Sequence, residues 1–229
     1  MKSVLILLLT FGLVGVAEAD PYKGIAFAGG SYSGNAAAYA GTLLALPGDS
    51  LGKGFALKLA ASGGSYEYDG GPGQVDVTYY GGVVGLAHQW SGAWGWATFS
   101  AGASMTQTDL TPFDPGNDRA GFRTDAVLAT DGAVYIDPQW RVDWYGESGV
   151  RNESYLARVT MLRSVKKERW MVGAEGIIQG DPAYQKKSVG AVLAYNVSNR
   201  VVIRVSTGAV FQDARNMRPY GTIGISRMF

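Results

Sequence analysis

Charged side chains at alternate positions of otherwise apolar segments are the residues of this chain best able to do chemistry. In residues 139–149, Trp140, Val142 and Trp144 share one parity, and the charged residues hold the other. This period of two is a strand pattern and places all such charges on one face. The predicted inward-facing charges are four basic and three acidic residues: Lys58, Arg141, Asp143, Glu147, Arg158, Glu175 and Arg204. Because the two signs can neutralise one another, the pattern indicates a narrow or filled interior and not a one-sign pore.

A second group of polar residues lies in residues 109–119, DLTPFDPGNDR. Its candidate outer-loop residues are Asp109, Asp114, Asn117 and Asp118. Their oxygens are of the kind that Ca²⁺ takes, but the spacing does not match the known calcium loop. Prolines beside Asx residues also describe a rigid turn that is hydrogen-bonded to itself. The sequence therefore favours a structural loop and predicts no metal or other cofactor.

His88 is the only histidine in the chain, which excludes any site with two histidine ligands. Outer-membrane acyl hydrolases pair a histidine with a serine on barrel strands that face the outer leaflet. His88 lies instead beside a short turn at Ser91 and Gly92, at the opposite end, with no evident nucleophile near it in sequence. A packed or interfacial histidine is the preferred interpretation, and no catalytic residue is predicted.

Alternating strands must position these groups, and residues 75–108 show them most clearly. In the second half of this segment the polar parity holds Thr98, Ser100, Ser104 and Thr106, and the other parity is apolar. Each run exceeds ten residues, whereas a usual strand has roughly 5–6. Long strands with one apolar and one small polar face are typical of a barrel wall between lipid and a polar interior.

The whole chain divides into similar segments separated by Gly, Pro, Asn and Asp. The predicted strands are residues 24–32, 36–46, 54–68, 74–89, 93–108, 122–136, 139–149, 153–164, 169–179, 187–195, 200–211 and 219–229. The predicted fold class is therefore all-β, an antiparallel outer-membrane β-barrel of about twelve strands, with ten as the alternative. An even count places residues 109–121, 180–186 and 212–218 in outer loops. Asp76 and Thr78 indicate that the even-numbered positions of the first long strand face inward, yet Val84 and Leu86 share that parity, so Gly81 and Gly82 are expected to form a bulge that shifts the register.

The N-terminal segment and the composition limit the class of protein to which the chain can belong. Residues 1–19 combine Lys2, a short apolar run and a small-residue cleavage site, so they are expected to be a secretory signal peptide, followed by a single barrel domain in residues 20–229. The 33 glycines are about twice the usual share of ~7%, as curved walls use. With a net charge of +1, the chain has no overall positive potential that would attract nucleic acid. The expected location is the outer membrane, with its lipid as the surrounding partner.

Several strings resemble the cellulose biosynthesis protein BcsS family. They are FAG at 27–29, AYAG at 38–41, LALPGD at 44–49 and DLTPFDPGN at 109–117 with Gly121. Pro47 departs from the asparagine expected there. The resemblance implies an exported accessory protein of bacterial cellulose production, whose partners are cellulose or the cellulose synthase and export assembly. It carries over no catalytic residues.

The expected function is therefore a non-enzymatic outer-membrane barrel accessory to cellulose biosynthesis or export. An oligosaccharide-conducting outer-membrane channel is the first alternative, and an outer-membrane lipid hydrolase is the second. A soluble periplasmic β-sandwich is the competing fold. Interior aromatic rings would serve the expected function by stacking on sugars; the candidates are Tyr66, Tyr68, Tyr79, Tyr80, Trp94, Trp96 and Tyr145.

Overall fold

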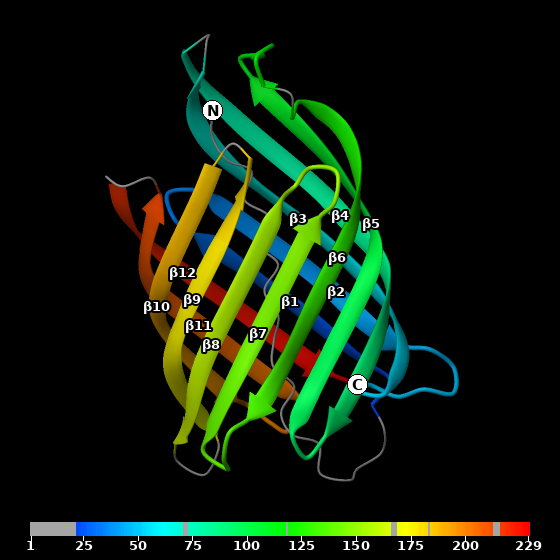
Figure 1. Ribbon diagram of the computed structural model, residues 1–229. Coiled ribbons are helices and arrows are strands. Elements are labelled where there is room, and N and C mark those ends of the chain that lie inside the picture. The colour runs from blue at the N-terminus through cyan, green and yellow to red at the C-terminus, as the bar shows by residue number, and fades with distance from the viewer. Residues whose placement is uncertain (1–21, 71–72, 118, 166–168, 183, 213–215) are drawn as a thin grey trace.

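The protein is a closed barrel of twelve antiparallel strands (Figure 1). The computed structural model describes residues 22–70, 73–117, 119–165, 169–182, 184–212 and 216–229. The strands are β1 Gly24–Tyr32, β2 Ala36–Ala45, β3 Gly54–Gly70, β4 Gly73–Gly92, β5 Gly95–Thr111, β6 Gly121–Tyr135, β7 Trp140–Gly149, β8 Tyr155–Val165, β9 Trp170–Asp181, β10 Tyr184–Asn196, β11 Val201–Gln212 and β12 Asn216–Met228. The predicted twelve-stranded barrel is thus confirmed, and the ten-stranded alternative is wrong. Among these residues no helix is long and apolar enough to cross a bilayer.

The barrel closes where β1 pairs with β12, from Ile25 opposite Met228 to Tyr32 opposite Gly221. Phe229 completes this seam: its carbonyl accepts the Lys23 N–H at 2.7 Å, and its own N–H donates to Gly24 at 2.9 Å. Each strand otherwise pairs with its neighbours in sequence, so the topology is a simple up-and-down meander. The predicted signal peptide, residues 1–19, lies outside the described residues, as does Asp118.

Exposed apolar side chains from the successive strands form an apolar band on the outside of the barrel. On β4 its edges are marked by two exposed rings, Trp90 at the end that carries the C-terminus and Tyr80 toward the other end. Ten residues at about 3.3 Å each, tilted by about 45°, cover roughly 23 Å, close to the height of ~25 Å expected of a lipid-facing band. Exposed Val84 and Leu86 lie between the two rings.

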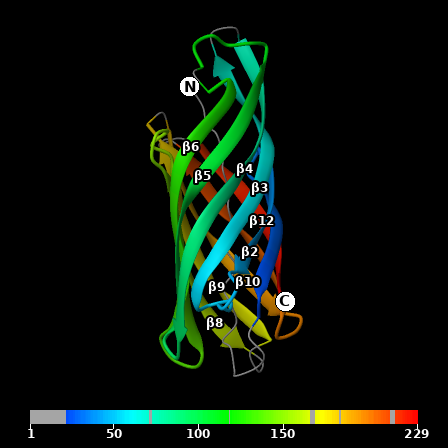
Figure 2. The ribbon, with the colours of Figure 1, turned by 90° about the vertical axis from the view of Figure 1, so that its right-hand side faces the viewer.

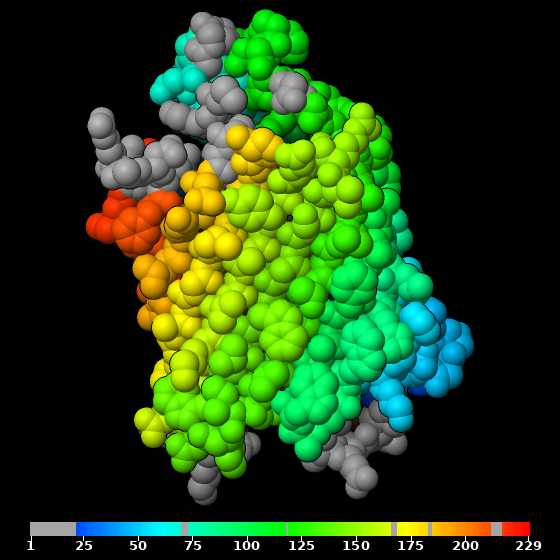
Figure 3. Space-filling model, viewed as in Figure 1, coloured from blue at the N-terminus to red at the C-terminus, as the bar shows by residue number. Residues whose placement is uncertain are grey.

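Four strands, β3 to β6, rise above the rest of the barrel (Figures 1 and 2). The outer end of the neighbouring strand β2 lies opposite Ser65 on β3, and the outer end of β7 lies opposite Val127 on β6. Above those points the four strands pair only among themselves, and we call this part the outer extension. Its tip is the highest part of the molecule in Figure 3.

In the outer extension the structure differs from two of the expectations about β4. Asp76 and Thr78 face outward and not inward, because the outward side there lies above the apolar band, where it meets water. The register of β4 with β3 and β5 runs through Gly81 and Gly82 without a break, so the predicted bulge is absent. The even-numbered residues therefore face outward along the whole of β4. Only the surroundings of this outward face change, from lipid beside the apolar band to water above it.

Candidate functional site: the barrel interior and its outer mouth

All seven charged residues singled out by their parity point into the barrel. Lys58, Arg141, Asp143, Arg158, Glu175 and Arg204 are each at most 9% exposed. Glu147 is partly buried near the outer end of β7. The strands that carry them alternate these charges with outward apolar residues such as Val142, Val159 and Val205. A Lys or Arg that faced lipid at mid-depth would cost roughly 2–4 kcal/mol, which fixes the register of these strands.

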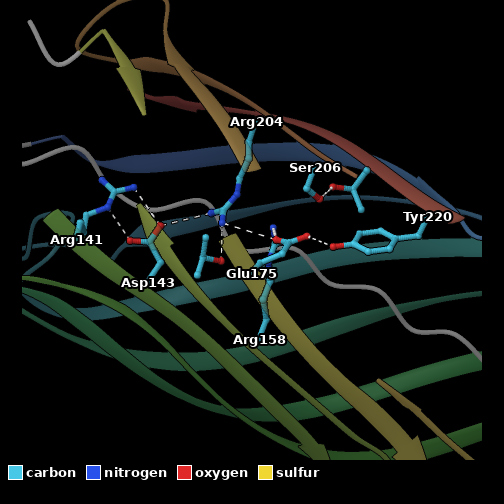
Figure 4. Close-up of polar contacts among 9 residues, drawn as sticks. Arg141, Asp143, Arg158, Glu175, Arg204, Ser206 and Tyr220 are labelled. Carbon is cyan, nitrogen blue, oxygen red and sulfur yellow. Dashed lines mark hydrogen bonds and ion pairs between the residues drawn. The ribbon is translucent and has the colours of Figure 1, made fainter. Parts of the chain in front are cut away.

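Asp143 on β7 joins two arginines from different sides of the barrel (Figure 4). Arg141 Nη2, two residues away on the same strand face, donates to Asp143 Oδ2 at 3.0 Å. Arg204 Nη1, on β11, donates to the same oxygen at 3.4 Å. Arg204 also donates through Nη2 to the Thr160 hydroxyl on β8 at 2.6 Å. These contacts cross the interior, since β7 and β11 are four strands apart around the wall.

Glu175 on β9 is the second centre of this network (Figure 4). It pairs with Arg158 on β8, and Arg204 Nη2 lies 4.0 Å from the same carboxylate oxygen. The Tyr220 hydroxyl, from β12, donates to the other oxygen at 2.8 Å. Gly190 and Gly208 make room for this tyrosine, because a Cβ at either position would collide with its ring or hydroxyl. Tyr220 was missed by sequence reasoning, although its parity on β12 places it inside.

A second bridge crosses the interior nearer the outer mouth. Lys58 Nζ on β3 lies 3.8 Å from Glu147 Oε2 on β7, and it sits over the ring of Tyr145. The Tyr145 hydroxyl donates to the same Glu147 oxygen at 2.5 Å. The strands β3, β7 and β11 are each four apart in the closed barrel of twelve, so the two bridges link three evenly spaced points of the wall.

The outer-loop residues divide into different roles. Asp114 is buried and accepts hydrogen bonds from the Tyr68 hydroxyl at 2.8 Å and from the Gly116 N–H at 3.0 Å. Asn117 donates to the same Tyr68 hydroxyl at 2.8 Å. Asp109 instead lies on β5, exposed on the outward face, where it accepts from Gln107. No group of three or more His, Asp or Glu side chains in the described ranges could hold a metal ion.

Tyr68 belongs to an aromatic cluster on the inner face of the outer extension. Tyr66, Tyr79, Val75 and Val77 are buried with it. Burial raises the pKa of Tyr66 to about 12. Of the other aromatic candidates, Trp96 and Tyr145 are also buried inside, whereas Tyr80 faces outward on β4 and Trp94 is exposed in the β4–β5 turn.

A pocket of about 940 Å³ lies at the outer mouth, and we call it the outer vestibule. It is bounded by the outer ends of β5 to β9, by the β5–β6 and β7–β8 connections and by Pro182. Its described charged residues are three basic and three acidic: Arg119, Arg123, Arg151, Glu147, Glu153 and Asp181. Arg119 forms an ion pair with Asp181, and Glu147 is the floor residue that reaches Lys58.

Asp125 on β6 fixes one wall of the outer vestibule. Its two carboxylate oxygens accept the backbone N–H groups of Arg151 at 2.7 Å and Asn152 at 3.1 Å. This clamps the short β7–β8 turn against β6, beyond the last paired residues of those strands. A Cβ at Gly149 would lie 2.5 Å from the Asp125 carboxylate, so a larger residue there would displace the side chain that forms the clamp.

His88 lies on the outward face of β4, away from this site. Its ring contacts Phe55 at 4.6 Å and Trp90 at 4.4 Å between centroids. The side chain is half-buried among rings at the lower edge of the apolar band. The His88 ring is therefore packed between two other rings on the outward face of β4.

Solved structures with a similar fold are outer-membrane barrels. A KdgM porin in complex with disordered oligogalacturonate has a TM-score of 0.55 at 9% identity, covering 90% of this chain and 99% of the porin. The transport unit of the autotransporter AIDA-I from Escherichia coli has a TM-score of 0.50 at 10% identity, covering 95% of this chain and 93% of that one. At such low identity these similarities show the fold alone.

Sequence comparison gives a more specific result. No curated protein sequence matches this chain. A family model described as cellulose biosynthesis protein BcsS matches residues 25–229, which is essentially the whole barrel. The match includes every strand, the interior network and the residues of the outer vestibule. The chain therefore belongs to the cellulose biosynthesis protein BcsS family.

Proposed function

We propose that this protein is a non-enzymatic outer-membrane barrel, exported through a cleaved signal peptide, that assists cellulose biosynthesis or export. The barrel stands with the export assembly and contacts the glucan, or partners of its synthase, through its outer loops and mouth. The family match over residues 25–229 is the observation that carries this proposal. The outer extension supports it, because four strands project a structured surface beyond the apolar band.

The paired charges inside the barrel favour an accessory role over a sugar-conducting channel. A channel for charged oligosaccharides would need an interior of one prevailing sign to attract its substrate. Here Asp143, Glu175 and Glu147 are each in contact with a basic side chain, and the bridges from Arg204 and Lys58 cross the interior. Because these side-chain bridges cross the interior, they narrow the path for a solute along the barrel axis.

Deleting the gene and measuring cellulose at the cell surface tests the proposal. The expected result is a loss of surface cellulose that is restored by the intact gene. Unchanged cellulose in amount and attachment would refute the functional proposal and leave the fold as it stands. Outer-membrane fractionation and heat-modifiable gel migration of the mature chain test the location independently.

A further inference from the structure

The outside of the barrel is basic at the end that carries the C-terminus (Figure 1). Arg163 on β8 and Arg227 on β12 face outward there, because the residues next to them, Leu162 and Met228, are buried inside. These positions lie at the edge of the apolar band, at the level of lipid headgroups. With two arginines of the adjoining turns they form a set that we call the basic rim: Arg163, Arg169, Arg200 and Arg227, all exposed.

The guanidinium groups of the basic rim are not neutralised by carboxylates. Within the described residues no ion pair joins any of the four to an Asp or Glu side chain. The carboxylate of the neighbouring β6–β7 turn, Asp137, instead accepts the backbone N–H groups of Gln139 at 2.7 Å and Trp140 at 2.8 Å. An anion from outside the chain can therefore pair with these arginines.

Aromatic rings hold two of the arginines in place. The Arg163 guanidinium lies 5.6 Å from the centroid of the Trp140 ring, and that of Arg200 lies 5.5 Å from the centroid of Tyr22. Such a contact uses the face of the guanidinium and leaves the N–H groups at its edge to donate. Arg163 uses one of them toward Gln139 Oε1 at 3.4 Å. The remaining donors are arranged as a phosphate group requires.

The surface beside the basic rim suits the acyl chains of a lipid. Trp170 on β9 and Tyr195 on β10 stack at 4.4 Å between ring centroids, at the inner ends of their strands. Trp and Tyr prefer the boundary between membrane and water. Two residues farther into the band, Val172 and Leu193 are exposed on the same strands. A lipid whose phosphate lies at the basic rim can thus place its chains against an apolar wall.

The outer extension has the opposite charge on its outward face. Among the described residues of β3 to β6 that rise above the band, every outward-facing charged side chain is acidic: Glu67, Asp69, Asp76 and Asp109. An anionic headgroup is repelled there and attracted to the basic rim. The net charge of +1 therefore conceals a separation of charge along the barrel.

We propose that the basic rim binds anionic phospholipids of the adjacent membrane leaflet. Arg163, Arg200 and Arg227 donate to phosphate oxygens of the headgroups, and the stacked rings of Trp170 and Tyr195 pack against the first carbons of the acyl chains. Short turns mark the periplasmic end of outer-membrane barrels, so the occupant is a phospholipid of the periplasmic leaflet. This inference does not depend on the cellulose role.

Native mass spectrometry of the refolded mature chain tests this inference. Released from micelles that contain equal amounts of phosphatidylglycerol and phosphatidylcholine with the same acyl chains, the protein should retain phosphatidylglycerol preferentially. The double variant Arg163→Gln, Arg227→Gln should lower this preference by about tenfold, because two charge-assisted phosphate contacts are lost. The matched control Lys187→Gln, Arg218→Gln removes the same charge from exposed residues at the outer ends of β10 and β12 and should leave the preference unchanged.

Three results would overturn the inference. The first is equal retention of the two lipids by the intact protein. The second is an equal fall in both double variants, because a positive charge anywhere on the barrel would then suffice. The third is displacement of phosphatidylglycerol by inorganic phosphate, which has no acyl chains and would indicate a phosphate site in place of a lipid surface. Heat-modifiable gel migration establishes that both variants are folded before they are compared.

Discussion

Arg204 on β11 and Asp143 on β7 meet at 3.4 Å inside the barrel, although four strands separate them around the wall. Neighbouring strands are already joined by their backbone ladders. A side-chain contact over this separation therefore adds what the ladder cannot: it connects opposite parts of the wall through the interior. Both side chains are buried, and the contact gives each of them a partner of opposite charge.

Replacing Arg204 with methionine should destabilise the barrel. The change leaves the buried carboxylate of Asp143 with Arg141 alone and removes the bond to Thr160. The free energy of unfolding should fall by about 1–3 kcal/mol, because the Thr160 hydroxyl and the Asp143 carboxylate each lose a buried hydrogen-bond donor. Urea unfolding in lipid vesicles, followed by tryptophan fluorescence, measures it.

Arg163→Met is the matched control for this substitution. Arg163 is exposed on β8, where it lies over Trp140 and reaches Gln139. Its loss should cost about 1 kcal/mol or less. Equal effects of the two substitutions would mean that the interior network does not stabilise the barrel.

The bridge between Lys58 and Glu147 should restrict ion flow. We expect low single-channel conductance from the intact protein in planar bilayers. The double variant Lys58→Ala, Glu147→Ala should have a higher conductance, because it lacks the side-chain bridge from β3 to β7. The exposed pair Lys187→Ala, Glu67→Ala, which also leaves the net charge unchanged, should behave like the intact protein. A high, steady conductance in the intact protein would instead favour the channel alternative.

Tyr68→Phe should loosen the β5–β6 loop. The substitution removes the hydroxyl that donates to buried Asp114 and accepts from Asn117. Local opening should become easier by about 1–3 kcal/mol, because a buried carboxylate oxygen loses its donor. Faster tryptic cleavage after Arg119 would show this, and Tyr80→Phe, an exposed tyrosine on the outward face, should cleave at the rate of the intact protein.

Strand parity predicted the interior of this barrel well, and the outer extension less well. The seven charges could be placed because lipid outside makes an outward charge costly, so polar and apolar faces are distinct in the sequence. On the outer extension both faces tolerate polar residues, which is why Asp76 was assigned inward. The contact between Tyr68 and Asp114 joins residues 46 apart in sequence, and no local pattern carries that information.

His88→Ala should leave cellulose production and barrel assembly intact. The ring packs between Phe55 and Trp90, so its loss should cost about 1 kcal/mol of stability. Surface cellulose and heat-modifiable migration of the variant provide the test. A variant that assembles normally but has no activity in cells would revive the lipid-hydrolase alternative.

The limit of the lipid-facing band can be located with one strand. Val84 and Thr78 both face outward on β4, on opposite sides of Tyr80 along the strand. Val84→Arg places a charge near the middle of the apolar band and should cost roughly 2–4 kcal/mol of folding free energy. Thr78→Arg points into water from the outer extension, where it also lies beside outward-facing Asp109, so it should cost nothing measurable. Equal costs at both positions would contradict a band that ends at Tyr80, and with it the projection of β3 to β6 beyond the membrane.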